Sequence, residues 1–287
     1  MSAALEVVRA GLLTTIQDLG RPGFAHLGVP HSGAADAASH RLANALVGNR
    51  ESAATLESTL TGVALRTLGP VVVAVTGAQC PVFVGGVPAP WGAPVRLAPG
   101  QVLDVGEAET GLRSYVAVRG GVDVPPILGS RSRDVLSGIG PPPLADGARL
   151  AIGQDAGLEV RFGTTRTGPT SVPEVIVLPI TLGPRADWFT PGALSVLAES
   201  TYTVDERSNR VGLRLAGPRL ERARSGELAS EGMVLGAVQV PADGQPVVFL
   251  ADHPTTGGYP VVGVIVGDAL GAAAQARPGV SVSFALL

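Results

Sequence analysis

Short β-branched runs separated by single glycines and prolines are the feature that most constrains the fold of this chain. Its 287 residues include 39 glycines and 24 prolines, and these fall between apolar runs such as residues 71–76, 102–105 and 175–180. Val and Ile favour extended backbone, whereas Gly and Pro favour turns. Because 45% of the residues are hydrophobic, the chain can bury a core. The pattern predicts a mainly β protein with many short strands.

Capping and turn residues predict a few helices and a division into two domains. Asp36 can cap a helix over residues 37–47 that stops at Gly48, and residues 192–199 carry a shorter helical pattern. Turn-forming residues over 163–171 predict a boundary between an N-terminal β domain (1–168) and a C-terminal β domain (171–287). Residues 70–72 and 98–105 are similar to 246–248 and 277–284, which favours two related β units.

The absence of lysine excludes several kinds of chemistry. All 21 basic residues are arginine, so the chain has neither a Walker-type phosphate loop nor a lysine for Schiff-base chemistry. A Ser-Lys amidase centre and covalently attached biotin are excluded for the same reason. The formal net charge is −3 and no basic stripe is present, which argues against nucleic-acid binding.

Cysteine and histidine usage gives no sign of a metal site. The single cysteine, Cys80, lies in an apolar stretch and is expected to be a buried, unreactive thiol. The four histidines lack zinc-ligand spacing, so no metal is expected. No apolar run approaches membrane-spanning length and no basic leader precedes one, so we expect a cytoplasmic protein.

Residues 252–260, which we call the 252–260 loop, concentrate chemistry between two strand-like runs. The loop reads Asp-His-Pro-Thr-Thr-Gly-Gly-Tyr-Pro and lies between the apolar segments 247–251 and 261–266. Loops held by rigid strands often carry function, although a simple hairpin turn would also use Thr and Gly. Asp252 and His253 are adjacent, and because neighbouring residues of a strand point to opposite faces, we do not expect them to act as a pair.

Four further groups of polar residues are candidates for a site. They are Asp18 with Arg21, Ser32 with Asp36, residues 205–210, and residues 227–232. Arg207 and Arg210 can hold a carboxylate or phosphate, but a surface ion pair with Asp205 or Glu206 is the more ordinary role. Glu231 and Asp252 are candidate general acid or base groups.

Ordered motifs along nearly the whole chain resemble one family. They are Gln17-Asp18-Leu19-Gly20-Arg21, residues 29–36, residues 43–49, Leu56-Glu57, Gly183-Pro184-Arg185 with Trp188-Phe189, residues 208–212, Ser230-Glu231-Gly232, Gln239-Val240-Pro241 and residues 255–260. These motifs resemble the family variously called allophanate hydrolase subunit 2, KipA-like or the C subunit of 5-oxoprolinase, whose domain is similar to a biotin-dependent carboxyltransferase.

The resemblance implies a cyclophilin-like β-barrel architecture and a partner chain of the subunit-1 (KipI-like) type. In the 5-oxoprolinase branch, it implies ATP-driven cleavage of 5-oxoproline to glutamate, with a LamB/YcsF-type subunit as a further partner. Because the chain shows no recognisable nucleotide-binding loop, ATP is expected to bind mainly to partner chains. A stable lactam carbonyl must be activated before water attacks it. Allophanate hydrolysis itself belongs to a Ser-Ser-Lys amidase, which a chain without lysine cannot be.

Motifs and polar groups together give the candidate site residues. Asp252, Glu231 and His253 are the expected catalytic groups. The residues expected to contact substrate are Arg207, Asn209, Arg210, Ser230, Gln239, Thr255, Thr256, Gly257, Gly258, Tyr259, Asp18, Arg21, Ser32 and Asp36. Pro254 stands where the family usually has Gln, which removes an amide side chain from the loop.

Three functions remain open from the sequence. The first is a hydrolase subunit of an ATP-dependent, 5-oxoprolinase-type complex. The second is the carboxyltransferase component of a biotin-dependent, urea-type carboxylase working with a separate biotin carrier. The third is a non-catalytic, KipA-like regulatory subunit. A neighbouring gene for a LamB/YcsF-type subunit would favour the first function, and one for a biotin carboxylase the second.

Overall fold

The chain folds into two compact units. The computed structural model describes residues 4–154, 157–160, 162–163, 174–226 and 228–287. The first unit comprises residues 1–21, 36–134 and 138–172, and the second comprises residues 22–35, 135–137 and 173–287. Most of the predicted boundary, residues 163–171, lies outside the described residues.

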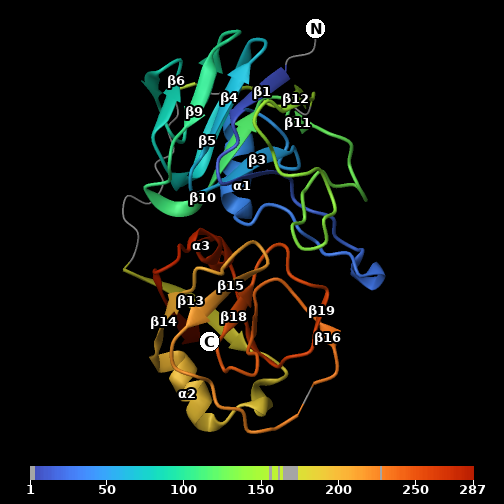
Figure 1. The fold of residues 1–287 in the computed structure, drawn as a ribbon, viewed down its shortest axis with the longest axis vertical. Helices are drawn as coiled ribbons and strands as arrows, with labels where there is room; N and C mark the ends of the chain where they lie inside the picture. Colours follow the sequence, from blue (N-terminus) through green and yellow to red (C-terminus); the bar gives the residue numbers. More distant parts are fainter. Residues whose placement is uncertain (1–3, 155–156, 161, 164–173, 227) are drawn as a thin grey trace. The chain divides into compact units, whose positions relative to one another are not determined.

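The first unit contains two sheets (Figure 1). The seven-stranded sheet has the order β11-β12-β1-β4-β9-β6-β7. Its strands are β1 (Ala4–Arg9), β4 (Val63–Thr67), β6 (Val82–Val84), β7 (Val87–Ala89), β9 (Val102–Val105), β11 (Val122–Asp123) and β12 (Arg149–Ile152). The five-stranded sheet has the order β2-β3-β10-β5-β8. Its strands are β2 (Leu13–Gln17), β3 (Thr55–Thr59), β5 (Val71–Gln79), β8 (Val95–Leu97) and β10 (Thr110–Val118).

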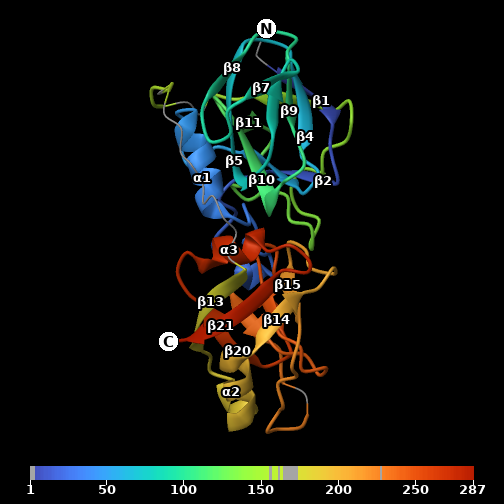
Figure 2. The same cartoon turned by 90° about the vertical axis from the view of Figure 1, so that its left-hand side faces the viewer.

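Alternation along the strands gives the five-stranded sheet two different faces. Ile16, Leu56 and Val116 are paired neighbours that face the core shared with the other sheet. Glu57 and Tyr115, each next to one of these residues in its strand, pair with each other and lie on the opposite face. Helix α1 (Ala37–Leu46) packs on β5 and β10 (Figure 2). The sheet therefore buries apolar side chains on one face and polar ones beneath α1, as the period of two requires.

The second unit is built on a closed barrel of seven strands with the order β13-β20-β17-β18-β15-β14-β21. The strands are β13 (Val175–Leu182), β14 (Thr201–Val204), β15 (Gly212–Ala216), β17 (Ala237–Gln239), β18 (Val247–Phe249), β20 (Val261–Ile265) and β21 (Ser281–Leu286). β13 and β21 pair in parallel, and the other barrel pairs are antiparallel. Closure gives each of these described strands a neighbour on both sides.

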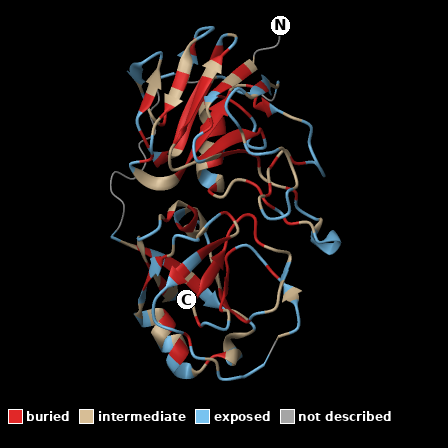
Figure 3. Ribbon diagram, viewed as in Figure 1, coloured by how far each residue is buried: buried red, intermediate tan, exposed pale blue. Residues whose placement is uncertain are grey.

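Apolar side chains fill the barrel, and short helices adjoin it. The buried strands appear red in Figure 3, and the core includes Leu178, Tyr202, Val238 and Phe284. Helix α2 (Pro191–Glu199) packs on β21, and α3 (Ala269–Gln275) packs on β13. Two single-turn helices, η1 (Ala25–Leu27) and η2 (Ala186–Trp188), complete the described helices.

The predicted mainly β fold class with a barrel is confirmed, as are the helices after Asp36 and before Ser200. The helix α3 and several short strands carry no strong sequence signal. Two segments of the N-terminal half, residues 22–35 and 135–137, group with the second unit. Local turn patterns could not indicate this grouping, because it depends on contacts made far along the chain. No helix in the described ranges is long and apolar enough to cross a membrane.

Candidate functional site

The 252–260 loop connects two barrel strands that do not neighbour each other. It follows β18 and precedes β20, and β17 lies between these strands in the barrel and pairs with both. The simple hairpin considered from the sequence is therefore wrong. Because the loop must pass from one side of β17 to the other, it is longer than a tight turn and has room for side chains that do not serve the turn.

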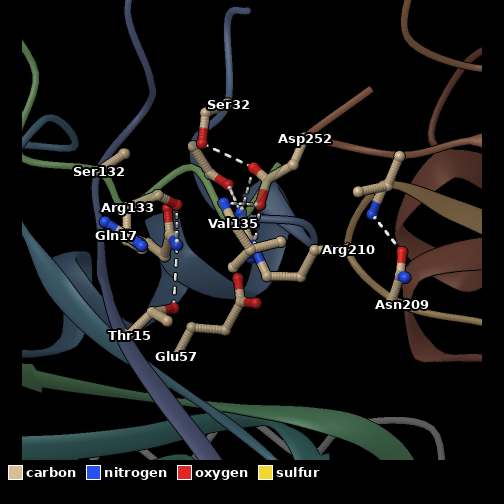
Figure 4. A network of polar contacts seen from close by, with 12 residues as sticks. Thr15, Gln17, Ser32, Glu57, Ser132, Arg133, Val135, Asn209, Arg210 and Asp252 are labelled. Atoms are coloured by element: carbon tan, nitrogen blue, oxygen red, sulfur yellow. Dashed lines mark hydrogen bonds and ion pairs between the residues drawn. The ribbon is translucent and has the colours of Figure 1, made fainter. Parts of the chain in front are cut away.

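Asp252, at the start of the loop, forms a buried ion pair with Arg210 (Figure 4). Arg210 Nε lies 2.8 Å from Asp252 Oδ2, and Arg210 Nη2 lies 3.0 Å from Oδ1. Ser32 Oγ donates to Oδ1 at 2.7 Å, and the backbone N–H of Val135 donates to Oδ2 at 3.0 Å. The side chain of Asp252 is 0% exposed. A carboxylate with this set of donors is stable as a buried charge.

The same ion pair fixes the backbone of the segment 22–35. Arg210 Nη2 also donates to the carbonyl of Gly33 at 2.6 Å. Ser32 has a positive φ of 56°, which is uncommon for a residue with a side chain. The hydroxyl bond to Asp252 helps to hold this conformation. The geometry favours a positioning role for Asp252, Arg210 and Ser32, in place of the catalytic and substrate-contacting roles expected from the sequence.

His253 follows directly but has a different environment. Its Nδ1 lies 2.8 Å from the carbonyl oxygen of Pro254, and its ring stacks on Phe249 with the centroids 6.1 Å apart. Asp252 and His253 therefore have separate partners, as alternation predicted. The whole residue is 7% exposed. Its orientation is fixed on two sides, which is the arrangement that a hydrogen-bonding or proton-transferring group needs.

The middle of the loop forms a short two-stranded antiparallel sheet with the segment that contains Glu231. Strand β19 (Thr256–Gly257) pairs with β16 (Glu231–Gly232), and the N–H of Met233 donates to the carbonyl of Thr255 at 2.9 Å. This small sheet brings together two parts of the chain that the sequence singled out separately. It places Glu231 opposite Gly257.

Gly257 lets the loop lie close to Gln239 and Met233, and a side chain here would have to displace them. A Cβ there would lie 2.6 Å from Gln239 Nε2 and 3.2 Å from Met233 Sδ. Gln239 is buried on β17, and its Nε2 donates to the carbonyl of Tyr259 at 3.1 Å. A Cβ at Gly258 would meet only the carbonyl of Leu228, at 3.4 Å. The two glycines thus serve different purposes, and the first lets the loop pack on Gln239.

Glu231 is paired with Arg185, which precedes helix η2. Arg185 Nε lies 2.9 Å and 3.0 Å from the two carboxylate oxygens, and Nη2 also donates to Oε1. Hydrogen bonds from this guanidinium lower the pKa of Glu231 below its usual range. The pair is partly exposed. Glu231 is therefore an ionised carboxylate. Unlike the buried Asp252, it can be reached by solvent and by a ligand.

Arg222 contacts the predicted site residue Tyr259 and is itself a residue that sequence reasoning missed. The Arg222 guanidinium lies 5.9 Å from the centre of the Tyr259 ring, within cation–π range. Its Nη2 donates to the carbonyl of Val240 at 2.8 Å, and its buried Nε has no partner within the described residues. Arg222 stands in a charged, exposed stretch, so no local pattern distinguishes it from a solvated side chain.

The remaining barrel candidates are on the surface. Arg207 is 77% exposed and is paired with Asp205, its Nε lying 2.8 Å from Oδ1. Asn209 closes a turn by accepting from the N–H of Val211 at 2.8 Å. Ser230 and Thr256 are exposed, and Thr255 and Gly258 are partly buried. The structure therefore separates Arg207 from Arg210, which we had expected to act together.

The candidates in the first unit support one of its loops. Asp18 accepts from the hydroxyls of Ser130 and Ser132 at 2.6 Å and 2.5 Å, and from the N–H of Arg131 at 2.6 Å. Arg21 is buried and donates to the carbonyl of Ser132. These contacts hold residues 130–132 rigidly. They favour a supporting role for Asp18 and Arg21.

Asp36 caps α1, as predicted. Its Oδ1 accepts from the N–H of Ser39 at 3.0 Å, and its own N–H donates to the hydroxyl of Tyr115 at 2.8 Å. Tyr115 in turn donates to Glu57 at 2.8 Å. This buried network links the start of α1 to the sheet below it. Within the described residues, no group of three His, Cys, Asp or Glu side chains is arranged to hold a metal ion.

Comparisons with known proteins agree with the motifs. The chain is 38% identical to the C subunit of 5-oxoprolinase from Escherichia coli over 270 residues, which cover 91% of this chain and 84% of that protein. It is 32% identical to urea amidolyase of Saccharomyces cerevisiae over 98% of its own length, but spans only 16% of that protein. The crystal structure of the K. lactis urea amidolyase matches 100% of this chain and 19% of that chain, with a TM-score of 0.91 and 30% identity.

The family assignment follows from a match over most of the chain. A family model described as the carboxyltransferase domain, subdomain A and B, matches residues 27–286. That range contains the whole described barrel, the 252–260 loop and the segment that holds Ser32 and Gly33. The chain therefore belongs to the family of the carboxyltransferase domain, subdomains A and B.

Proposed function

We propose that this chain is a subunit of an ATP-dependent, lactam-cleaving complex of the 5-oxoprolinase type, and that it acts with a subunit-1 (KipI-like) partner. The observation that carries this proposal is the 38% identity to the C subunit of 5-oxoprolinase from Escherichia coli over 84% of that protein's length. The name of that relative describes one subunit of an enzyme. We infer that this chain likewise needs partner chains for activity.

The local chemistry supports a site for a small polar amide at the 252–260 loop. A lactam carbonyl is unreactive, so it must be polarised, and negative charge that develops on its oxygen must be stabilised. Arg222 and Arg185 are guanidinium groups near the loop that are not buried in an ion pair. Arg210 is already engaged by Asp252. We therefore assign charge stabilisation to Arg222 or Arg185 and assign the scaffold to Arg210.

ATP, a co-substrate of the proposed reaction, would be held largely by partner chains. The chain has no lysine, and the sequence contains no glycine-rich phosphate loop of the Walker type. The groups that could contact a phosphate here are arginines and backbone amides. The lack of lysine also means that no biotin is attached to this chain.

The second candidate function is carboxyl transfer to a urea-type amide. The family model and the similarity to urea amidolyase over 98% of this chain favour it. The two functions share a substrate class, a small amide, but differ in the group that reacts with it. Lactam cleavage consumes ATP and water, whereas carboxyl transfer needs a carboxylated biotin on another protein.

Reconstitution separates these functions. The chain would be co-expressed with a subunit-1 partner and a LamB/YcsF-type subunit, and glutamate formation would be followed from 5-oxoproline and ATP. The proposal predicts ATP-dependent glutamate, and none when this chain is left out. Carboxyl transfer from carboxybiotin to urea without any glutamate would establish the second function instead. Full lactam-cleaving activity without this chain would show that it is a regulator.

A further inference from the structure

The hydrogen bond made by His253 determines which of its ring nitrogens faces a ligand. Nδ1 lies 2.8 Å from the carbonyl oxygen of Pro254. A carbonyl oxygen only accepts hydrogen bonds, so the proton of the neutral ring must be on Nδ1. Nε2 then carries a lone pair and is an acceptor. Stacking on Phe249 holds the plane of the ring, and a half-turn within that plane would lose the hydrogen bond to Pro254.

The acceptor nitrogen of His253 is available to a ligand. Nε2 has no hydrogen bond within the described residues, yet it is not among the buried polar atoms that lack a partner. His253 is 7% exposed, so the ring is mostly but not completely shut off from solvent. Because the ring is already largely buried and held in place, a ligand that bonds to Nε2 displaces little water and causes little loss of side-chain entropy.

Gln239, on β17, is a second buried side chain whose donor bonds to the loop, in this case near the C-terminal end of the loop. Its Nε2 donates to the carbonyl of Tyr259 at 3.1 Å and lies 3.8 Å from Met233 Sδ. This fixes the amide with its donor turned toward the loop. Its Oε1 has no hydrogen bond in the described part of the chain, and the residue as a whole is 6% exposed. A second acceptor is thus presented by a buried side chain.

Both side chains border the same small apolar cluster. Met233, Ala237, Val247, Phe249 and Val261 form this cluster, separate from the main barrel core. His253 stacks on Phe249, and Gln239 contacts Met233. In each side chain the donor nitrogen bonds to a carbonyl oxygen of the loop, that of Pro254 or Tyr259. The acceptor atom of each side chain is then left for a ligand.

We propose that His253 Nε2 and Gln239 Oε1 accept hydrogen bonds from amide N–H groups of a ligand, and so select ligands that carry such donors. A urea-type amide can donate to both acceptors, and a lactam, which has a single N–H, can donate to one of them. The proposal rests on the proposed function, because it names the part of the amide that this region recognises. Carboxylate and phosphate oxygens bring only acceptors and would be repelled by these lone pairs. N–H donors of a small amide match them.

The tautomer of His253 can be measured without any ligand. Long-range ¹⁵N–¹H correlation spectra of the full chain, with His253→Gln used to assign the signals, should show neutral His253 protonated on Nδ1 and bare on Nε2. Addition of 5-oxoproline or urea should shift the Nε2 resonance. A ring protonated on Nε2 would overturn the proposal, whatever the function of the complex.

Ligand selectivity provides the second test. Binding of 5-oxoproline and of its N-methyl derivative would be compared in the assembled complex by calorimetry. The wild type should prefer the N–H ligand by about tenfold, the worth of a good hydrogen bond. His253→Asn keeps a donor near the carbonyl of Pro254 but has no acceptor at the position of Nε2, so it should lose most of this preference. Gln239→Leu should weaken it as well.

The possible outcomes separate this proposal from the proposed function. If the wild type binds both ligands equally, the recognition of N–H groups is wrong even if the complex cleaves lactams. If the complex binds neither 5-oxoproline nor urea, the proposed substrate class is wrong. The spectra of the unliganded chain would still show whether Nε2 of His253 is the unprotonated, hydrogen-bond-accepting nitrogen. His253→Gln places an amide near the Nε2 position, and partial recovery of selectivity in this variant would support the proposal.

Discussion

Two arginine–carboxylate pairs adjoin the 252–260 loop, and they differ in burial. Arg210 and Asp252 are almost completely buried and are completed by Ser32 and Val135. Arg185 and Glu231 are about one-third exposed and bond mainly to each other. The chemical groups are the same, but the buried pair is tied into the fold and the exposed pair lies at its surface.

The difference indicates which pair is structural and which is available to a ligand. Removing one member of a buried pair leaves an uncompensated charge, which is strongly destabilising. An exposed pair contributes little to stability because water solvates both ions. We therefore expect substitutions at Asp252 to affect folding first, and substitutions at Glu231 to affect function first.

The largest expected effect is that of Asp252→Asn. The substitution leaves Arg210 buried without a counter-ion, so the free energy of unfolding should fall by about 3–5 kcal/mol. Urea denaturation followed by circular dichroism measures this loss. Ser32→Ala is the matched milder change, because it removes one donor to Asp252 and leaves the ion pair. A stability of Asp252→Asn equal to that of the wild type would contradict the structural role.

A second prediction uses the paired glycines at the centre of the loop. Gly257→Ala places a Cβ 2.6 Å from Gln239 Nε2, and relief of this contact should cost about 1–3 kcal/mol. It should also displace the acceptor of Gln239 and weaken ligand binding. Gly258→Ala is the control, since its Cβ would lie 3.4 Å from the carbonyl oxygen of Leu228, an ordinary contact distance. Equal effects of the two substitutions on thermal unfolding and binding would refute this distinction.

A third prediction concerns the pKa of His40 in the first unit, which is buried and hydrogen-bonded to neutral groups, the Thr55 hydroxyl and the Glu51 carbonyl. Burial lowers the pKa of His40 below its usual 6.5, and its Nε2 lies 2.9 Å from the carbonyl of Glu51. The unfolded chain therefore binds a proton more readily than the folded one. Stability is fully present above about pH 6.5 and decreases as the pH falls below it.

The measurement is the thermal midpoint between pH 8 and pH 5. We expect the wild type to lose a few degrees over this range through His40, and His40→Gln to have a flatter profile with a lower midpoint at pH 8. Parallel profiles for the two proteins would show that His40 does not titrate in this way.

The smallest effect on stability is expected for Glu231→Gln. The pair with Arg185 is exposed, so the unfolding midpoint at pH 7 should remain within error of the wild type. Because Arg185 lowers the pKa of Glu231, the carboxylate stays ionised in the folded chain at pH 5. The pair is lost only as the pH falls below the usual range of a glutamate.

Activity of the assembled complex provides the contrasting measurement for this variant. If Glu231 contacts the ligand, kcat/KM should fall by about tenfold or more while stability is unchanged. A normal kcat/KM would show that the exposed pair is an ordinary surface contact.

Some of this architecture follows from local sequence alone. The β-branched runs became strands such as β5 and β13, Asp36 caps α1, and the ordered motifs indicate the family. Strands with few β-branched residues, such as β15 and β17, escape such patterns. Helix α3 is rich in alanine, which alone does not distinguish a helix from a buried loop.

The sequence by itself determined the fold class, the cap of α1 and the residue types present in the 252–260 loop. Only the tertiary structure decided which of those residues meet. Ser32 reaches Asp252 across 220 positions, and Arg185 reaches Glu231 across 46. These contacts depend on the strand order of the barrel, in which β17 separates β18 from β20. Local patterns specify where a strand begins and ends, but strand order is set by packing over the whole unit.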